Sequence, residues 1–461
     1  MNLIQAMQNK TYTENGMPTG KSSGSKVLDF FYKAPASNDF SAMTNLFIEA
    51  YNEDHVLATK ALFYLRDIRG GQGRREMFRK IFQYLCIWHP SLACQIYEYI
   101  PEYGRWDDLL VGLNSMIEEV IGNMILWHIG TGNNLAAKWM PRDNKAGKAN
   151  AIRLQKLWNM TPKQYRKFLV EHTNVVENQM CLKNWQKIIY EHVPSKAMLK
   201  YHKAFGRNDE DRLIEYLSLV NAGKKKINAG TIYPHEIVHK ILYEYDGENK
   251  TYQALWNNLP NFVKESNFIP VCDVSESMEG TPMGISIALG MYLSERNIGP
   301  FKDAFITFSE KPRLEYLQGD LFSKLDALYS ADWGYNTNLE AVFNLILEAA
   351  ATNYVKPEDM PKNILIISDM QFDRCTKLPS NSAMQMIQYM YISNGYAVPN
   401  IIFWNVRDSN GVPVSMHESG AALISGYSPS IMQYLGLDEI TPYSVMLKTL
   451  NSKRYERIKV E

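Results

Sequence analysis

The chain has 461 residues, of which 46% are hydrophobic and 12% aromatic, so it can bury the cores of two or more domains and is not a disordered protein. No run approaches the roughly 20 apolar residues that cross a bilayer, and the N-terminus lacks the pattern of a secretory signal, so we expect no membrane attachment. The net charge of zero hides +7 in residues 1–265 (34 basic, 27 acidic) and −7 in residues 266–461 (15 basic, 22 acidic), which indicates different partners for the two halves.

The first part of the chain changes from a polar to a helical pattern. Residues 1–40 are rich in Gly, Ser, Asn and Lys, a composition typical of a loosely ordered lead-in. From 41 to 265, apolar residues recur at helical spacing and Gly, Pro and Asn interrupt them. We predict a solenoid-like region of HEAT-like helix pairs, although no clear sequence period is present. Among its expected helices are Asp54–Ile68, one that begins at Thr161-Pro162, Asp209–Val220 and His235–Tyr245.

Glycine loops and basic clusters in this helical region fit phosphate groups. Residues 66–75 form a glycine loop flanked by arginines, and residues 141–170 hold eight basic residues and one acidic residue. Free backbone N–H groups and guanidinium forks both suit phosphate oxygens, and nearby Tyr and Trp can stack on bases. The alternative is ordinary helix connections with interhelical ion pairs. The residues that we expect to contact RNA are Arg69, Arg74, Arg75, Lys138, Arg142, Lys145, Lys148 and Arg153.

A rival motif, H-E-x-x-H, spans His235-Glu236-Ile237-Val238-His239. On a helix, the two histidines share one face and can bind zinc, with Glu236 as the general base of a metallopeptidase. The sequence upstream is helical in pattern, whereas such peptidases place a mixed sheet there, and no third ligand is recognisable. The simpler reading is that Glu236 favours a helix N-terminus and His239 packs or faces solvent. A zinc metallopeptidase is therefore the minor alternative.

After residue 266, strand-like and helical runs alternate. This alternation predicts a parallel sheet with helices on both faces, a Rossmann-like α/β domain. The whole chain is thus expected to be a multidomain protein, helical from 41 to 265 and α/β from 266 to 461. The expected strands are Phe268–Cys272, Ala304–Phe308, Asn363–Ile367 and Asn400–Trp404, and the expected helices are Pro282–Glu295, Leu339–Ala351, Ser382–Ser393 and Pro442–Arg457.

Small oxygen-bearing side chains follow two of these strands. The motif D-x-S-x-S places Asp273, Ser275 and Ser277 after the first strand, Thr337 precedes a helix, and Asp369 ends another strand. Because strand ends in an open parallel sheet face one crevice, these residues can converge. Carboxylate and hydroxyl oxygens suit Mg²⁺ or Mn²⁺ better than zinc or copper. The aspartates, with Asp373, leave a two-metal nuclease as an alternative, although the hydroxyl groups favour a single metal.

This constellation resembles the metal-ion-dependent adhesion site of von Willebrand factor A domains, over roughly residues 266–461. The resemblance implies that Ser275, Ser277 and Thr337 bind the metal directly, and that Asp273 and Asp369 bind it directly or through water. It also implies an open coordination position for the carboxylate of a protein partner. Two features depart from the family pattern, Met370 in place of a glycine and the distance of Gly334 from Thr337. A site that no longer binds metal is the alternative.

A second resemblance covers the chain from about residue 25. Residues 69–76, 104–109, 136–142, 193–198 and 226–237 resemble motifs of an uncharacterised family of plant, fungal and viral proteins that joins a helical region to a von Willebrand-type domain. That architecture is similar to the Ro autoantigen, or TROVE-module, family. There, a ring of helical repeats binds small structured RNAs and RNA 3′ ends, with a von Willebrand-type domain at its seam. The RNA-binding residues of that ring do not align with this sequence, so RNA binding is implied by architecture alone.

We therefore predict a non-enzymatic RNA-binding or ribonucleoprotein scaffold. The basic helical region would contact RNA, and the acidic half would hold Mg²⁺ and recruit a protein partner. The alternative is a protein-interaction or assembly module without RNA. Five cysteines without a C-x-x-C pair fit a reducing compartment, so we expect a cytoplasmic location.

Overall fold

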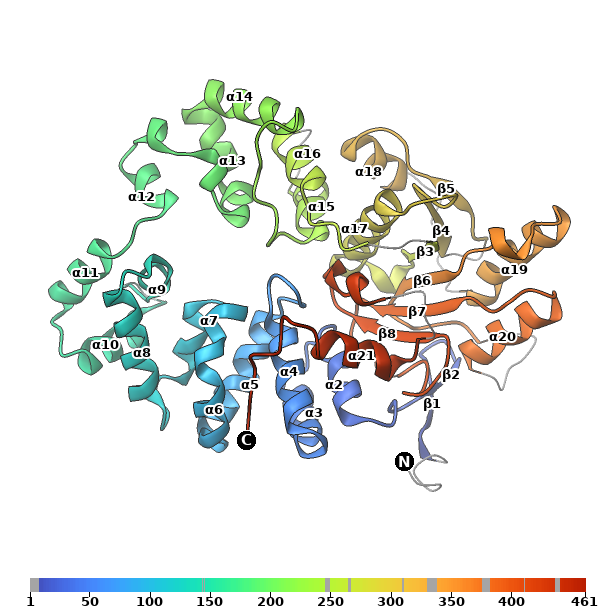
Figure 1. Ribbon diagram of the computed structural model, residues 1–461, viewed down its shortest axis with the longest axis horizontal. Coiled ribbons are helices and arrows are strands. Elements are labelled where there is room, and N and C mark those ends of the chain that lie inside the picture. Colours follow the sequence, from blue (N-terminus) through green and yellow to red (C-terminus); the bar gives the residue numbers. More distant parts are fainter. Residues whose placement is uncertain are drawn as a thin grey trace.

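The structure is a computed structural model that describes residues 8–142, 144, 146–244, 249–263, 267–308, 311–329, 338–374, 382–409, 411–435 and 440–461. Its elements form a curved array of helices and an α/β part built on a mixed sheet (Figure 1). No helix within these ranges is long and apolar enough to cross a membrane.

Short helices with short connections build the curved array. Asp39 and Asp54 cap the helices that follow them. Thr161 caps a helix at the expected start, just before Pro162, and it forms a capping box with Gln164. The predicted helices at 54–68, 209–220 and 235–245 are confirmed to within a few residues. The α-helices of the array are α2 (Lys26–Lys33), α3 (Phe40–Glu53), α4 (His55–Arg66), α5 (Arg75–Trp88), α6 (Pro90–Ile96), α7 (Ile100–Tyr103), α8 (Glu118–Gly130), α9 (Asn134–Trp139), α10 (Lys148–Leu157), α11 (Pro162–Glu171), α12 (Val176–Cys181), α13 (Ser195–Asn208), α14 (Glu210–Asn221), α15 (Pro234–Tyr243) and α16 (Lys250–Asn257). The 3-10 helix η2 (Trp106–Gly112) lies between α7 and α8.

The described part of the N-terminal lead-in is ordered, which corrects the expectation for residues 1–40. Strands β1 (Lys10–Tyr12) and β2 (Pro18–Gly20) pair as a hairpin. Helix α2 follows, and its apolar residues between 27 and 32 are buried. Ser25 caps this helix, since its hydroxyl accepts a hydrogen bond from Leu28 N. The polar composition of residues 1–40 outweighed the short apolar run at residues 27–32, which packs α2 against its neighbours.

The α/β part is a six-stranded sheet in the order β5-β4-β3-β6-β7-β8. All neighbours are parallel except the edge pair β4 and β5. Helices α17 and α21 lie on one face and α19 and α20 on the other (Figure 1). The bounds are β3 (Phe268–Asp273), α17 (Thr281–Arg296), β4 (Ala304–Phe308), β5 (Leu314–Tyr316), α18 (Leu321–Tyr329), α19 (Leu339–Thr352), β6 (Asn363–Ser368), α20 (Ala383–Ser393), β7 (Asn400–Asn405), β8 (Ala421–Ser425) and α21 (Pro442–Leu450).

The strand order creates a switch point between β3 and β6. From β3 the chain proceeds outward through β4 to β5, then returns to the other side of β3 as β6 and continues to β8. Connections therefore leave the carboxyl ends of β3 and β6 in opposite directions, which opens a crevice beside these two ends. The four predicted strands and three of the predicted helices are confirmed, whereas β5 and β8 were not predicted.

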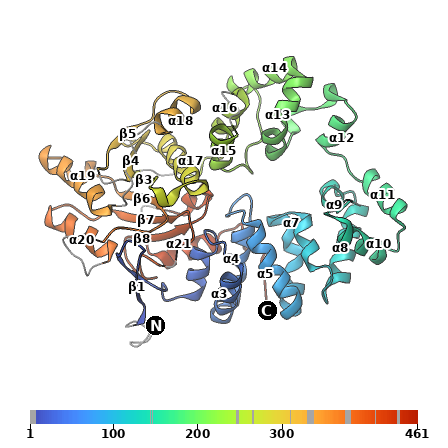
Figure 2. The same cartoon turned by 180° about the vertical axis from the view of Figure 1, so that it is seen from behind.

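Both ends of the helical array meet the α/β part. Helix α2 contacts β8 and α21, and α15 packs on α17 (Figures 1 and 2). The last predicted helix is too long, because α21 ends at Leu450 and the following turns cross onto the array. There Arg454 pairs with Asp67, and the hydroxyl of Tyr103 donates to the carbonyl of Arg454 at 2.8 Å. The helices therefore close into a ring with the α/β part at its seam.

Candidate functional site

The switch point gathers the oxygen-bearing residues that the sequence singled out. Asp273 ends β3 directly beside Ser368 of β6, whose hydroxyl donates to Asp273 Oδ2 at 2.7 Å. Asp273 Oδ1 accepts the backbone N–H of Ser275 at 2.9 Å, and the hydroxyl oxygens of Ser275 and Ser277 lie 3.0 Å apart. The structure thus brings Asp273, Ser275, Ser277 and Asp369 together at the carboxyl ends of the central strands β3 and β6, which we call the carboxyl edge of the sheet. Thr337 lies outside the described residues.

The electrostatics of this edge suit a cation. Asp273 is fully buried and Asp369 is 1% exposed. Burial and the neighbouring Asp369 carboxylate raise the pKa of Asp273 to about 6, against the hydrogen bonds from Ser368 and Ser275. Two buried carboxylates and two nearby hydroxyls form a hard-oxygen donor set, and a divalent ion would relieve the repulsion between the acids. The residues present therefore fit Mg²⁺ or Mn²⁺.

Met370 occupies the position where the family pattern has a glycine. Its backbone adopts a conformation that glycine accommodates easily. Its φ is +64°, in the left-handed region that is costly for most side chains. The turn is held by Met370 N, which donates to Ser368 Oγ at 3.0 Å, and by Gln371 N, which donates to Asp369 Oδ1 at 3.1 Å. The Met370 side chain is 3% exposed, so its burial offsets the backbone strain. The turn that orients Asp369 forms without the glycine.

Arg407 also belongs to this edge, and the sequence analysis missed it. It follows the end of β7, and its guanidinium group donates to the carbonyl of Ser277. One guanidinium nitrogen lies 3.9 Å from Asp369 Oδ2. The arginine thus places a positive charge beside the two acids. Its position just after a strand end was the signal that could have identified it.

Asp373, considered for a two-metal nuclease, lies further along the same loop. It forms an isolated antiparallel bridge with Gly16 of the N-terminal hairpin. The hydroxyl of Thr13 also donates to the carbonyl of Phe372 at 2.8 Å. These contacts give the loop after Asp369 a role in docking the hairpin.

The glycine loop at residues 66–75 lies at the seam of the ring. Gln72 Oε1 accepts the backbone N–H groups of Tyr427 and Ser428 at 3.1 and 3.3 Å. Arg74 donates to the carbonyl of Ser37 at 2.6 Å and lies over the ring of Tyr427. The loop therefore joins the array to the α/β part.

Ion pairs engage three of the other basic candidates. Arg75 pairs with Asp107 at 2.8 Å, Lys138 with Glu177 at 2.9 Å, and Arg153 with Glu118. Burial lowers the pKa of Arg142, whose guanidinium donates to Thr173 at 3.3 Å. Arg69 is exposed and donates to the carbonyl of Glu102 at 3.3 Å. Lys145 lies outside the described residues. For the paired residues, these contacts favour the structural alternative that the sequence left open.

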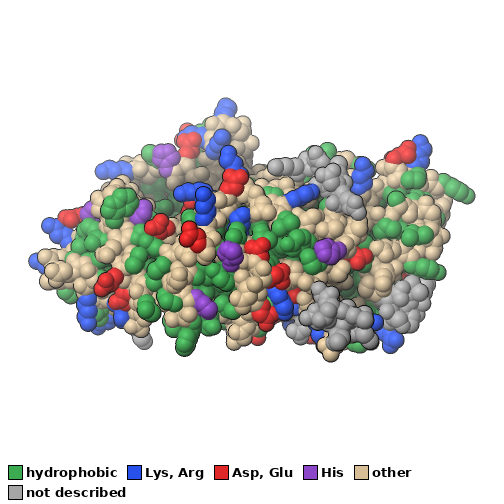
Figure 3. All heavy atoms as spheres, turned by 60° about the horizontal axis from the view of Figure 1, so that its bottom comes forward, with side chains coloured by type: hydrophobic (Ala, Val, Ile, Leu, Met, Phe, Trp, Pro, Cys, Tyr) green, Lys and Arg blue, Asp and Glu red, His purple; other side chains and the backbone are tan. Residues whose placement is uncertain are grey.

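Exposed cations without ion pairs lie instead along α10 and α11. Within the described part of the chain, four side chains of these two helices are exposed and unpaired, namely Lys148, Lys156, Lys163 and Arg166. Among the predicted RNA contacts, Lys148 alone of the described residues belongs to this group. On the face shown in Figure 3, basic side chains are spread between acidic and hydrophobic ones. We call these four residues the outer basic surface.

The H-E-x-x-H motif forms the start of α15, as the helical reading expected. Glu236 caps the helix by accepting Tyr233 N at 2.9 Å and also pairs with Lys196. His235 contacts the rings of Tyr233 and Tyr427, and burial lowers its pKa to about 4. No cluster of three His, Cys, Asp or Glu side chains able to hold a metal occurs among the residues that the structure describes. Glu236 thus has the capping role expected for the simpler reading.

Comparisons with known proteins agree in covering most of the chain. Residues 13–119 and 129–266 match "Domain of unknown function (DUF2828)", and residues 267–451 match "Domain of unknown function (DUF7788)". The chain is 31% identical to "Uncharacterized protein L728" of Acanthamoeba polyphaga mimivirus, over 96% of this chain and 88% of that protein.

A solved structure shares the architecture. The crystal structure of the Ro (RSR) protein from Deinococcus radiodurans aligns with a TM-score of 0.52 and 14% sequence identity. The alignment covers 93% of this chain and 99% of that one. The two proteins therefore share a fold, in which a curved array of helices meets an α/β part at both of its ends.

Proposed function

The chain belongs to the family described by DUF2828, and we propose that it is a non-enzymatic, cytoplasmic RNA-binding scaffold of the Ro type. The observation that carries the proposal is the likeness to the Ro protein across 93% of this chain. The Ro family resemblance implies structured RNAs and RNA 3′ ends as ligands. A closed ring of helices offers a preformed surface for such ligands, which lowers the ordering cost of binding.

The outer basic surface is suited to phosphate groups. Its lysine and arginine side chains are exposed and are not neutralised by acidic neighbours among the described residues. Each cation that contacts a phosphate releases counterions, so it adds about 0.7–0.9 to the slope of log affinity against log salt. Arg75, Lys138 and Arg153 already have carboxylate partners and would have to break ion pairs to contribute.

Charge reversal on this surface tests the proposal. We expect the triple variant Lys156→Glu, Lys163→Glu and Arg166→Glu to weaken RNA binding and to reduce the salt slope by about 2–3. A matched control reverses three exposed lysines of the α/β part, Lys302, Lys311 and Lys362, with the same change in net charge. Equal loss in both variants would mean that only net charge matters, and no loss in either would remove the outer basic surface from RNA binding.

We further propose that the α/β part is a von Willebrand factor A domain whose adhesion site holds Mg²⁺ or Mn²⁺. Asp273, Ser275, Ser277, Thr337 and Asp369 would hold the ion, which supplies an open position for a carboxylate. Support comes from the buried acids and hydroxyls at the switch point of the sheet. The partner captured there would be a protein with an exposed acidic side chain.

Calorimetric titration with Mg²⁺ tests the metal site. Wild-type protein should bind one equivalent, and Asp273→Asn, which keeps the side-chain shape, should bind none. Absence of binding to the wild type would identify a site that no longer binds metal.

A second candidate function is a protein-assembly module that uses the metal site without RNA. It is favoured by the internal contacts of four predicted RNA-contacting residues, Arg74, Arg75, Lys138 and Arg153. The two functions separate cleanly, because assembly requires Asp273 but tolerates the charge reversals on α10 and α11.

A further inference from the structure

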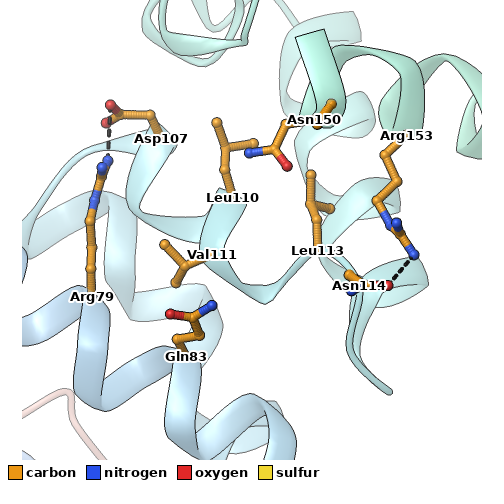
Figure 4. A pocket seen from close by; sticks show the side chains of 10 residues that line it. Arg79, Gln83, Asp107, Leu110, Val111, Leu113, Asn114, Asn150 and Arg153 are labelled. Carbon is orange, nitrogen blue, oxygen red and sulfur yellow. Dashed lines mark hydrogen bonds and ion pairs between the residues drawn. The ribbon is translucent and has the colours of Figure 1, made fainter. Parts of the chain in front are cut away.

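A pocket opens between α5, η2 and α10 that neither the metal site nor the seam uses. Figure 4 shows Arg79 and Gln83 of α5 on one side and Asn150 and Arg153 of α10 on the other. Leu110, Val111 and Leu113 form an apolar floor between them. The pocket volume is about 460 Å³, within the range of small-ligand sites.

The charges around the pocket are already balanced. Arg79 pairs with Asp107 at 2.9 Å and with Asp108 at 2.6 Å. Arg153 pairs with Glu118, and its Nη2 donates to Asn114 Oδ1 at 2.6 Å. A bare phosphate would have to compete with these carboxylates. The pocket therefore favours an uncharged ligand that is polar at its edge and flat or apolar on its face.

Two amide side chains supply free hydrogen-bonding groups. Within the described part of the chain, the side-chain amides of Gln83 and Asn150 have no hydrogen-bond partner, and each carries one acceptor and two donors. They come from opposite walls above the apolar floor. Asn114, at the rim, has a φ of +74°, a left-handed conformation held by hydrogen bonds to Arg153 and Glu118. The rim is thus built into a fixed geometry.

An amide matches adenine in particular, because it can donate to N7 and accept from the N6 amino group at the same time. Such a base reaches a pocket only when it is unpaired and splayed out of its stack.

We infer that this pocket receives the adenine base of an unpaired nucleotide, with Gln83 and Asn150 reading its edge over the floor formed by Leu110, Val111 and Leu113. The inference rests on the proposed RNA-binding function, and it adds base preference to a surface that otherwise recognises only phosphates. The nucleotide can come from an RNA strand or from free adenosine monophosphate, and both present the same base.

Binding of labelled oligoadenylate and oligouridylate, measured by fluorescence anisotropy, tests the inference. Wild-type protein should bind oligoadenylate about ten-fold more tightly than oligouridylate. Asn150→Leu and Gln83→Leu, which keep approximate size and charge, should remove this preference. Ala149→Phe, which narrows the mouth and removes no polar group, should do the same. Asn221→Leu, an exposed amide on α14 away from the pocket, is the matched control and should keep the preference.

Equal binding of the two oligonucleotides by folded wild-type protein, or a preference that survives Asn150→Leu and Ala149→Phe, would overturn the inference. Competition by adenosine monophosphate but not by uridine monophosphate would support a pocket that a single nucleotide fills. A preference that adenosine monophosphate cannot compete away would support the pocket as part of an RNA-strand site.

The same experiment separates this inference from the proposed function. Binding of adenosine monophosphate without any RNA binding would refute the scaffold function and keep the pocket. RNA binding without base preference would keep the scaffold and refute the pocket. Binding of none of these ligands would refute both.

Discussion

Replacing Arg454 with methionine is expected to destabilise the protein by about 3–5 kcal/mol, because it leaves a buried charge without its partner. Arg454 Nε and Nη2 donate to the two oxygens of Asp67 at 2.8 and 2.9 Å. The Asp67 side chain is 0% exposed and that of Arg454 is 27% exposed. Partial burial opposes the charge of Arg454, but the Asp67 carboxylate outweighs it and raises the pKa of Arg454.

Without Arg454, the carboxylate of Asp67 keeps two neutral donors, the backbone N–H of Arg69 at 3.0 Å and the hydroxyl of Tyr455 at 3.2 Å. Methionine retains the apolar contact with the ring of Tyr103, over which the guanidinium lies at 4.7 Å. The loss of stability therefore reports mainly the ion pair with Asp67, together with the longer contact of Arg454 with Glu102 at 3.7 Å.

Arg457→Met provides a control at the same seam. Arg457 pairs with Glu102 Oε2 at 2.8 Å, but its side chain is 71% exposed. Solvent screens such a pair, so its loss should cost less than about 1 kcal/mol. The double variant Asp67→Asn and Arg454→Met should recover part of the stability, since the buried charge is gone. Urea denaturation measures all three, and equal losses for Arg454→Met and Arg457→Met would refute the assignment of a buried ion pair at the seam.

Three further changes follow from the switch point and from α15. Asp273→Asn should stabilise the metal-free protein by about 1–3 kcal/mol, because a carboxylate that is fully buried beside Asp369 becomes neutral; a loss of stability in chemical denaturation would contradict this. Arg407→Ala should raise Mg²⁺ affinity about ten-fold, since its guanidinium donates to Ser277 and lies 3.9 Å from Asp369 Oδ2, and calorimetry showing unchanged or weaker affinity would argue against a competing charge there. Burial lowers the pKa of His235 to about 4 from the ordinary 6.5, so between these values the unfolded chain binds a proton that the native chain does not. The contribution of His235 to stability should therefore fall by about 1–3 kcal/mol as the pH drops from about 6.5 to 4, while Asp273, whose pKa is raised to about 6, contributes in the opposite direction; a stability-versus-pH profile that His235→Gln leaves unchanged would exclude His235 as a source.

Sequence patterns predicted the central strands, whose apolar runs are distinct, but not β5 and β8. The runs at 268–272 and 363–367 are short, apolar and followed by Asp or Ser-Asp, which is what β3 and β6 require at a buried switch point. The edge strand β5 has only three residues and exposed ends, and the composition of β8, Ala-Ala-Leu-Ile-Ser, carries no clear strand preference. Pairing with the neighbouring strands β4 and β7 decides both.

Long-range contacts account for the rest. The glycine loop at 66–75 has the composition of a phosphate loop, but its partners Tyr427 and Ser430 lie more than 350 residues away in the sequence. Whether an arginine is free or paired likewise depends on distant acids, as Arg153 does on Glu118. For this reason the sequence could indicate a basic half but could not rank its cations, and it gave no sign of the pocket between α5 and α10.

The central claim is that this ring binds RNA through phosphate contacts. The most direct measurement is the affinity of purified protein for labelled structured and single-stranded RNA across a salt series, with and without Mg²⁺. The account predicts binding whose logarithm falls linearly with the logarithm of salt concentration, with a slope reduced by about 2–3 in the Lys156, Lys163 and Arg166 charge-reversal variant. Absence of binding at low salt, or binding that does not depend on salt, would contradict it.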